Sequence, residues 1–338
     1  MFKLESVPLI PLLVSSLLSF NGLRKKSLSP GGAATAFIVG LLMMAGGLKV
    51  FGISLIVFYL TGSRATKFGK LRKAQLEDGY QEAGYRTGWQ VLSNSLAAFV
   101  ACVLWNVFFS QGSLQATLLS LSGTEIRQAL VKTLGLNAGD LPEYGDGSAW
   151  CPIDQGIAGG WSRVFIYASL GHFGCCLGDT LASELGILSR SRPILITTLK
   201  PVPPGTNGGM SLGGTLASII GGIIMGFTMS VCLVLESSKC RAVWMSILLS
   251  MVFWGAMAGG TGSLVDSLLG ATIQQMKFSE SKKLILQDES TPTGPIKVIS
   301  GIDLLTGNQV SRESSLASIL STILARSMFF QASSPAYG

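Results

Sequence analysis

Carboxylates stand inside or at the edge of long apolar runs, an unusual place for groups that could do acid, base or metal chemistry. Asp179 and Glu184 end the run that begins near Trp161, and Asp266 lies near the end of the run 242–270. A charged side chain at membrane depth costs about 2.5 to 3.5 kcal/mol on insertion scales. Its retention therefore indicates a cavity, a partner or a substrate, unless the group is solvated or makes a structural hydrogen bond between helices. For Asp266 we consider both a packing hydrogen bond to a serine and a second carboxylate in a metal site around Asp179.

Helical spacing places further polar side chains beside these carboxylates. At 3.6 residues per turn, His172, Asp179 and Ser183 lie on one stripe of a helix, while Thr180 and Glu184 lie on the neighbouring stripe. Both stripes would line one side of the same helix end. The single histidine could assist chemistry there, although a lone histidine is more often structural.

A loop rich in proline and glycine follows that helix and could bind an anion. Three prolines in residues 199–214 stiffen its entry, and five glycines let the backbone approach a ligand closely. Loops rich in N–H groups that lead into a helix N-terminus bind phosphate. Glycines also serve ordinary turns, so the polar side chains among them carry much of this prediction. The candidate contacts are Lys200, Gly205, Thr206, Asn207, Gly208, Gly209 and Ser211.

Arg86 and Asn94 form another candidate phosphate contact. They flank the start of the apolar run 89–110 and follow a basic loop, whose charges would ordinarily be solvated or meet anionic lipid. A solvated or lipid-facing loop does not explain Asn94, because this residue is polar, lies early in an apolar helix and follows Arg86 closely. Together the two side chains could bind a phosphate.

The composition is that of a polytopic membrane protein. Of 338 residues, 48% are hydrophobic and 13% are charged, against about 25% charged in soluble domains, and the mean hydropathy is +0.50. We predict an all-α helical bundle in one membrane domain, 1–338, whose 42 glycines favour close helix packing. The seven expected spans are 6–22, 31–48, 49–63, 89–110, 161–183, 212–235 and 242–270. Apolar spacing over 316–324 adds a C-terminal amphipathic or transmembrane helix.

The distribution of charge predicts the topology. Basic loops at 23–30, 64–88 and 184–211 would share one side, which the positive-inside rule assigns to the cytosol. The acidic loop 111–160 would form a lumenal cap on the other side, and 275–313 would be a cytosolic linker. The net charge of +7 is better explained by topology than by nucleic-acid binding. We expect an integral protein of the endoplasmic reticulum whose site faces the cytosol.

The spacing of the six cysteines does not indicate a pattern of disulfides or a zinc site. They contain no CxxC pair, and four of them lie in or beside apolar runs. We therefore predict neither a zinc site nor a disulfide framework.

Two segments share a pattern. The pattern Ser-x-Gly-Gly, followed by further small residues, occurs in 27–40 and again in 211–222. This hints at a distant internal duplication, which is common in membrane folds with a central site. Two glycine-rich packing helices would explain the pattern equally well.

Four segments together resemble a known integral membrane family. They are 178–186 (GDTLASELG), 200–209 (KPVPPGTNGG), 85–94 (YRTGWQVLSN) and 264–274 (LVDSLLGATIQ). They resemble the family that contains animal transmembrane protein 19 and the phytyl-phosphate kinase of plants and cyanobacteria, and the resemblance to the animal member covers essentially the whole chain. The first two motifs are the specific ones. The chain departs from the family pattern at 308–311, which reads Asn-Gln-Val-Ser where members often carry Asn-x-Val-Asn.

This resemblance implies transfer of a nucleotide γ-phosphoryl group to a prenyl monophosphate, giving the diphosphate, as in isoprenoid salvage. The plant branch is similar in turn to CTP-dependent kinases for phytol and dolichol, which implies Mg²⁺ and CTP or another nucleoside triphosphate. A phosphate monoester is already an anionic nucleophile, so positioning and charge neutralisation suffice. The implied metal ligands are Asp179, Glu184 and Asp266. The implied catalytic residues are Asp179, Glu184 and Lys200, with substrate contacts from Arg86, Asn94, His172 and the glycine-rich loop.

A transporter or scramblase of a small or lipid-phosphate substrate is the competing class. Glycine-broken helices, an intramembrane acid and an internal repeat suit such a protein equally well. Nucleotide binding would separate the two classes. The sequence leaves open the prenyl chain length, the nucleotide base and whether the protein forms a homo-oligomer.

Overall fold

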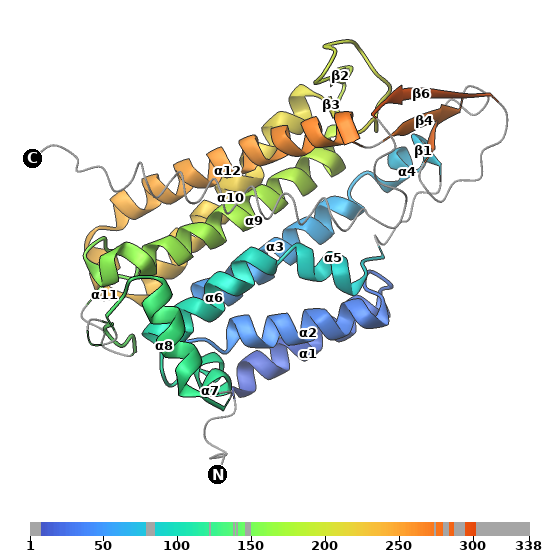
Figure 1. The fold of residues 1–338 in the computed structure, drawn as a ribbon. Helices are drawn as coiled ribbons and strands as arrows, with labels where there is room; N and C mark the ends of the chain where they lie inside the picture. Colours follow the sequence, from blue (N-terminus) through green and yellow to red (C-terminus); the bar gives the residue numbers. More distant parts are fainter. Residues whose placement is uncertain are drawn as a thin grey trace, which may run out of the picture.

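The computed structural model describes residues 8–78, 85–121, 123–137, 139, 141–145, 150–273, 275–279, 284–286 and 295–301. Long helices lie side by side in a bundle, and a small sheet projects from one end (Figure 1). The main helices are α1 (Leu9–Arg24), α2 (Pro30–Met44), α3 (Val50–Lys67), α6 (Leu96–Phe109), α9 (Trp161–Gly186), α10 (Leu212–Glu236) and α12 (Trp244–Ile273). Shorter helices are α4 (Lys70–Lys73), α5 (Gly88–Ser93), α7 (Leu114–Leu121), α8 (Thr124–Thr133), η3 (Ile157–Gly160) and α11 (Ser238–Ala242).

Six of the seven predicted apolar runs each form one main helix, and the run 89–110 is divided into α5 and α6, which confirms the helical membrane fold. Within the described residues, the segments 157–186, 212–236 and 244–273 are each long and apolar enough to cross a membrane. A fourth span results if α6 and α7, bent by 82°, count as one. The apolar helices α1 and α2 are shorter, with 16 and 15 residues. The expected C-terminal helix at 316–324 lies outside the described residues.

Glycine contacts bring α9, α10 and α12 together at the centre of the bundle. A Cβ atom on Gly178 of α9 would lie only 2.6 Å from Gly259 Cα of α12. A Cβ on Gly222 of α10 would collide with the backbone of Gly255 of α12. Backbones this close require glycine, as is common between membrane helices. The contact at Gly178 sets the neighbouring residue, Asp179, close to α12.

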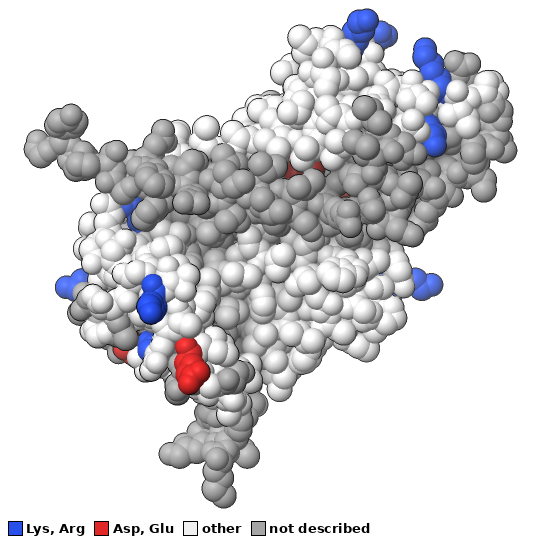
Figure 2. Space-filling model, in the orientation of Figure 1, with Lys and Arg blue, Asp and Glu red and all other residues white. Residues whose placement is uncertain are grey.

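The connections sort to two ends of the bundle. The loops after α1, α3, α9 and α12 all lie at one end, and the segment from α7 to η3 lies at the other (Figure 1). Lys and Arg side chains stand out at the end that carries the sheet, while the opposite end shows both signs of charge (Figure 2). The three basic loops of the predicted topology therefore share one end.

Short elements occupy segments that the sequence suggested were irregular. The 275–313 linker contributes β4 (Met276–Ser279), β5 (Leu284–Leu286) and β6 (Ile296–Ser300), which pair with β1 (Glu77–Asp78) in the order β1-β5-β4-β6. Within the cap 111–160, the chain forms α7 and α8. These elements have two to ten residues, too few for a clear hydrophobic period.

The two segments with a shared pattern begin helices in the same way. Ser29 caps α2 by accepting a hydrogen bond from the Gly32 N–H at 2.9 Å, and Ser211 caps α10 by accepting one from the Gly214 N–H at 3.1 Å. Serine is a favoured N-cap, so this similarity is local and leaves the duplication a hypothesis.

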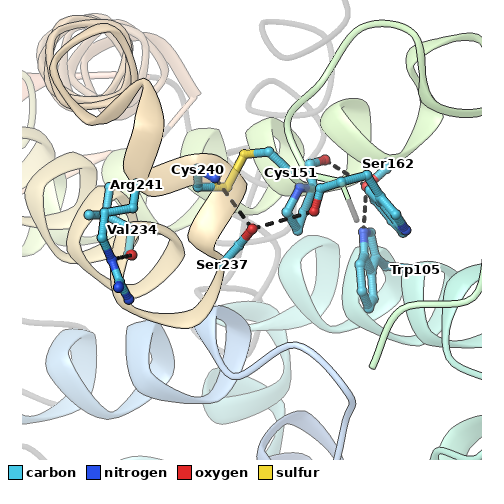
Figure 3. The surroundings of a disulfide bond; sticks show 9 residues. Trp105, Cys151, Ser162, Val234, Ser237, Cys240 and Arg241 are labelled. Carbon is cyan, nitrogen blue, oxygen red and sulfur yellow. Dashed lines mark hydrogen bonds between the residues drawn. A yellow bond between two sulfur atoms is a disulfide. The ribbon is translucent and has the colours of Figure 1, made fainter. Parts of the chain in front are cut away.

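The prediction that the chain has no disulfide framework is wrong at one pair. Cys151, just before η3, is bonded to Cys240 in α11, beside Ser237 (Figure 3). The residues are 89 positions apart, and only the antiparallel course of α9 and α10 brings both to the cap end. Disulfides persist mainly in oxidising compartments, so this pair bears on which side of the membrane the cap end faces. The other four cysteines are free and buried.

Alkylation can count the thiols. We expect a denatured, unreduced sample to add alkyl groups to four cysteines and a reduced sample to add them to six, because only Cys151 and Cys240 are bonded. Intact-mass spectrometry reads the number directly, and peptide mapping identifies the protected pair. Six reactive thiols before reduction, in protein isolated under acid trapping, would contradict the pairing.

Cysteine labelling can test the two ends. Arg192 and Lys132 are both exposed and lie at opposite ends, and the native free cysteines are buried, so they serve as a silent background. In sealed vesicles we expect an impermeant maleimide to label Lys132→Cys and Arg192→Cys from opposite sides. Labelling of both from the same side would refute the topology.

Candidate functional site

Asp179 and Ser183 lie between two cavities. One cavity, of about 300 Å³, extends among α1, α2, α3 and α9 and is mostly apolar. The other, of about 180 Å³, is polar and lies under the glycine-rich loop against α10 and α12. Asp179 and Ser183 line both cavities. Anything bound in one cavity would therefore meet, at Asp179, whatever is bound in the other.

The glycine-rich loop forms the roof of the polar cavity. Strands β2 (Ile194–Leu195) and β3 (Gly209–Met210) pair as a hairpin around it. Gly208 has φ +77°, and a Cβ there would lie 2.5 Å from Ala271 Cβ of α12, so glycine is required both by backbone conformation and by packing. Thr206 is buried and donates a 2.7 Å hydrogen bond to the Pro203 carbonyl. The loop is thus fixed on α12, where it encloses a polar space.

The N-terminus of α10 opens into the same cavity. Ser211 accepts its capping bond from Gly214 and donates a 3.2 Å hydrogen bond to the Gly186 carbonyl at the end of α9. Ser211, Gly214 and Thr215 all line the cavity. A helix N-terminus carries partial positive charge and N–H donors, so this end suits a phosphate.

Two predicted carboxylates meet in the polar cavity. The side chains of Asp179 and Asp266 are in hydrogen-bonding contact, and both line the cavity. The lining has no Lys or Arg among the described residues. Two carboxyl groups in contact repel each other unless a proton or a cation lies between them. Mg²⁺ fits such a pair, because it takes one or two carboxylates and completes its shell with water and substrate phosphates.

Glu184 is separate from that pair. Its carboxylate accepts a 2.6 Å bond from the Lys73 ammonium, which also donates to the carbonyls of Ala65 and Thr66 at 3.0 and 3.2 Å. The Lys73 side chain is 2% exposed. In the described part of the chain, no group of three or more His, Cys, Asp or Glu side chains could hold a metal ion. The three predicted carboxylates are therefore divided: Asp179 contacts Asp266, and Glu184 pairs with Lys73.

Arg86 stands at the polar end of the larger cavity. Asn94, Tyr59 and Glu184 line the same cavity, so the predicted contact of Arg86 and Asn94 shares one space. Burial lowers the pKa of the Arg86 guanidinium, and the nearby charges of Glu184 and Tyr59 oppose that shift. Glu184 is also paired with Lys73, so Arg86, Lys73 and Glu184 together carry one net positive charge, opposite in sign to the carboxylate of Asp179 in the same cavity.

His172 and Lys200 lie away from both cavities. His172 is fully buried and donates to the backbone carbonyl of Asn94, at the break between α5 and α6. Lys200 is exposed, and its carbonyl accepts from the Leu195 N–H at 2.9 Å. Neither residue is among those that line the cavities. His172 thus contacts the break between α5 and α6, and Lys200 lies on the exposed surface of the hairpin.

The sequence does not indicate that Lys73 and Tyr59 lie near the candidate site. Lys73 sits in a basic segment that is ordinarily solvated, and Tyr59 sits in an apolar run. Only the fold reveals that Lys73 is buried against Glu184 and that Tyr59 lines the same cavity as Arg86. No sequence pattern distinguishes Lys73 from the neighbouring basic residues.

Comparison with known proteins places the chain among membrane proteins. Residues 13–319 match the family described as integral membrane protein DUF92. Protein PGR of Arabidopsis thaliana is 33% identical over 318 residues, covering 94% of this chain and 96% of that protein. The chloroplastic protein VTE6 of A. thaliana is 26% identical over 148 residues, or 40% of this chain and 44% of that protein. An uncharacterized membrane protein of Methanocaldococcus jannaschii is 34% identical over 115 residues, or 34% and 42%.

No solved structure matches the chain. The family match spans most of the sequence, and the similarity to protein PGR extends over nearly the full length of both proteins. The chain therefore belongs to the integral membrane protein DUF92 family, as the motifs at 178–186 and 200–209 suggested.

Proposed function

We propose that the protein is a prenyl-phosphate kinase that transfers the γ-phosphoryl group of a nucleoside triphosphate to a prenyl monophosphate. One observation carries this proposal: Asp179 lines both a polar cavity suited to phosphates and an apolar cavity suited to a lipid tail. A two-substrate transfer needs its reacting groups to meet at one point. The motif resemblance to the phytyl-phosphate kinase supports the same activity.

The nucleotide would bind in the polar cavity. Its phosphates would accept hydrogen bonds from the 205–209 loop and from the N-terminus of α10. Asp179 and Asp266 would hold Mg²⁺, and Mg²⁺ supplies neutralisation of the phosphate charge when it is bound. Glu184, paired with Lys73, would help to orient the acceptor side of the site.

The prenyl monophosphate would bind from the other side of Asp179. Its phosphate would meet the positive charge of Arg86, and its tail would lie among α1, α2 and α3. A phosphate oxygen of the acceptor attacks the γ-phosphorus, the bond to the bridging oxygen breaks, and the nucleoside diphosphate leaves with that electron pair. The products are a prenyl diphosphate and a nucleoside diphosphate.

We further propose that the site faces the cytosol, with the endoplasmic reticulum as the host membrane. The disulfide Cys151–Cys240 supports this orientation because it lies at the opposite end of the bundle. The basic loops at the site end support it independently. A cytosolic site would have direct access to nucleotides.

The direct test is an assay with purified protein. γ-Labelled CTP and ATP would be incubated with Mg²⁺ and prenyl monophosphates, and labelled prenyl diphosphate would be separated by chromatography. Label in the diphosphate supports the kinase. No nucleotide binding, together with movement of prenyl phosphate across a vesicle, would instead support the transporter or scramblase.

Asp179→Asn tests the residue between the cavities. We expect this change to lower transfer by at least a hundredfold, because it keeps the size of the side chain but removes the charge that Mg²⁺ requires. Asp154→Asn is the matched control, since Asp154 is exposed at the cap end. Thermal unfolding should be similar for both variants. Turnover by Asp179→Asn at near wild-type rate in saturating Mg²⁺ would count against the role.

Arg86→Ala tests the acceptor phosphate contact. We expect KM for the prenyl monophosphate to rise about tenfold or more, because a hydrogen bond to a charged group contributes about 1.5–3 kcal/mol. The KM for nucleotide should change little. Lys200→Ala is the matched control, since Lys200 is exposed and lines neither cavity. An equal rise in KM for both substrates, or a larger rise in the KM for the prenyl monophosphate in Lys200→Ala than in Arg86→Ala, would contradict the role of Arg86.

A further inference from the structure

The apolar cavity has an end formed by residues of α1 and α2. A Cβ atom placed on Gly40 would lie 3.5 Å from Ser15 Cβ and 3.8 Å from Met44 Cε. Ser15, Gly40 and Met44 all line the cavity, and the side chain of Ser15 is turned onto the Pro11 carbonyl at 2.6 Å. We call these three residues the floor, because they lie far from Asp179 along the bundle.

Two helix contacts give the distance from the reacting end to the floor. A Cβ on Gly62 of α3 would lie 3.6 Å from Thr180 Cγ2, so Gly62 marks the level of Asp179 and Thr180. A Cβ on Gly52 would lie 2.6 Å from Met44 Cγ, so Gly52 marks the level of the floor. Ten residues of one continuous helix separate these levels, which corresponds to about 15 Å at 1.5 Å per residue.

That length corresponds to a short isoprenoid. An extended chain advances about 3.6 Å over three bonds, so the four main-chain bonds of an isoprene unit span about 5 Å. Three units would reach from Asp179 to the floor. The volume is consistent with a short tail, because about 300 Å³ is at the lower end of small-molecule pockets.

We propose that the floor of Ser15, Gly40 and Met44 limits the acceptor to about three isoprene units, so that a 15-carbon prenyl monophosphate is the preferred substrate. This inference rests on the proposed function for its readout of transfer, but binding alone also tests it. Arg86 fixes the phosphate at one end of the cavity, and the floor stops the tail at the other. The distance between the two ends selects the length.

Gly40 and Met44 are the residues that should change this length. The neighbours of Gly40 are at ordinary contact distance from an added Cβ, so a larger side chain there would extend into the cavity without first displacing backbone. Met44 is half-buried at the floor, and its truncation would lengthen the space. One missing or extra methylene in a hydrophobic pocket changes discrimination by about 10- to 200-fold.

The experiment measures transfer to prenyl monophosphates of 5, 10, 15 and 20 carbons. For the wild type we expect kcat/KM to peak at 15 carbons and to fall at least tenfold at 20. Met44→Ala should raise the 20:15 ratio at least fivefold, and Gly40→Leu should raise the 10:15 ratio at least tenfold. Ile38→Ala is the matched control, because Ile38 is 53% exposed on the outer face of α2 and should leave both ratios unchanged.

A second measurement separates this inference from the proposed function. Thermal stabilisation by the same four prenyl monophosphates, without nucleotide, reports binding even if no transfer occurs. If Gly40→Leu fails to fold, the wild type and Met44→Ala still give the comparison. Maximal stabilisation at 15 carbons, shifted to 20 in Met44→Ala, supports the floor. Stabilisation that does not depend on chain length overturns the proposed floor, whether or not the protein transfers phosphate. The same holds if Met44→Ala and Ile38→Ala change the dependence on chain length alike.

Discussion

The contact between the backbones of α9 and α12 is the constraint on which the rest of the site depends. Gly178 and Gly259 can approach so closely only because neither has a side chain. That approach brings Asp179 into contact with Asp266, although the two residues are far apart in sequence. The same helix end carries Gly186, which accepts the Ser211 bond and so holds the start of α10 and the loop beside the carboxylates. Small residues in the membrane thus position the charged ones.

Charge is distributed so that two negative substrates could meet at this point. The polar cavity offers carboxylates for a cation and a helix N-terminus for phosphate, without a basic side chain among its described lining. The apolar cavity offers Arg86 as a positively charged contact for a second phosphate, while Glu184 is paired with the buried Lys73. A buried ion pair is weak evidence for stability, but loss of one partner is costly, which ties α4 to the end of α9. The Lys73–Glu184 ion pair therefore connects the basic segment after α3 to the end of α9 that carries Asp179.

The sequence predicts the helices well because long apolar runs have few alternatives. It also points to Asp179, Asp266 and the 205–209 loop, which the fold brings to one cavity, since carboxylates in apolar runs and glycines before a helix are locally visible. It does not reveal the division of the carboxylates, because the pairing of Glu184 with Lys73 joins residues 111 positions apart. The disulfide and the small sheet are missed for a similar reason: their partners are distant, and the strands have only two to five residues. Lys200 is conspicuous in sequence but is exposed and lines neither cavity, and a motif alone does not fix where a side chain lies in a hairpin.

The central claim is that Asp179 lies between separate sites for a nucleotide and a lipid phosphate. The most direct measurement is a structure with Mg²⁺, a 15-carbon prenyl monophosphate and a nucleotide analogue that cannot transfer its γ-phosphate. We expect the triphosphate under the 205–209 loop, the metal between Asp179 and Asp266, and the tail among α1, α2 and α3, with the two phosphates facing each other across Asp179. A nucleotide bound outside the polar cavity, or both ligands competing for the same cavity, would contradict the account.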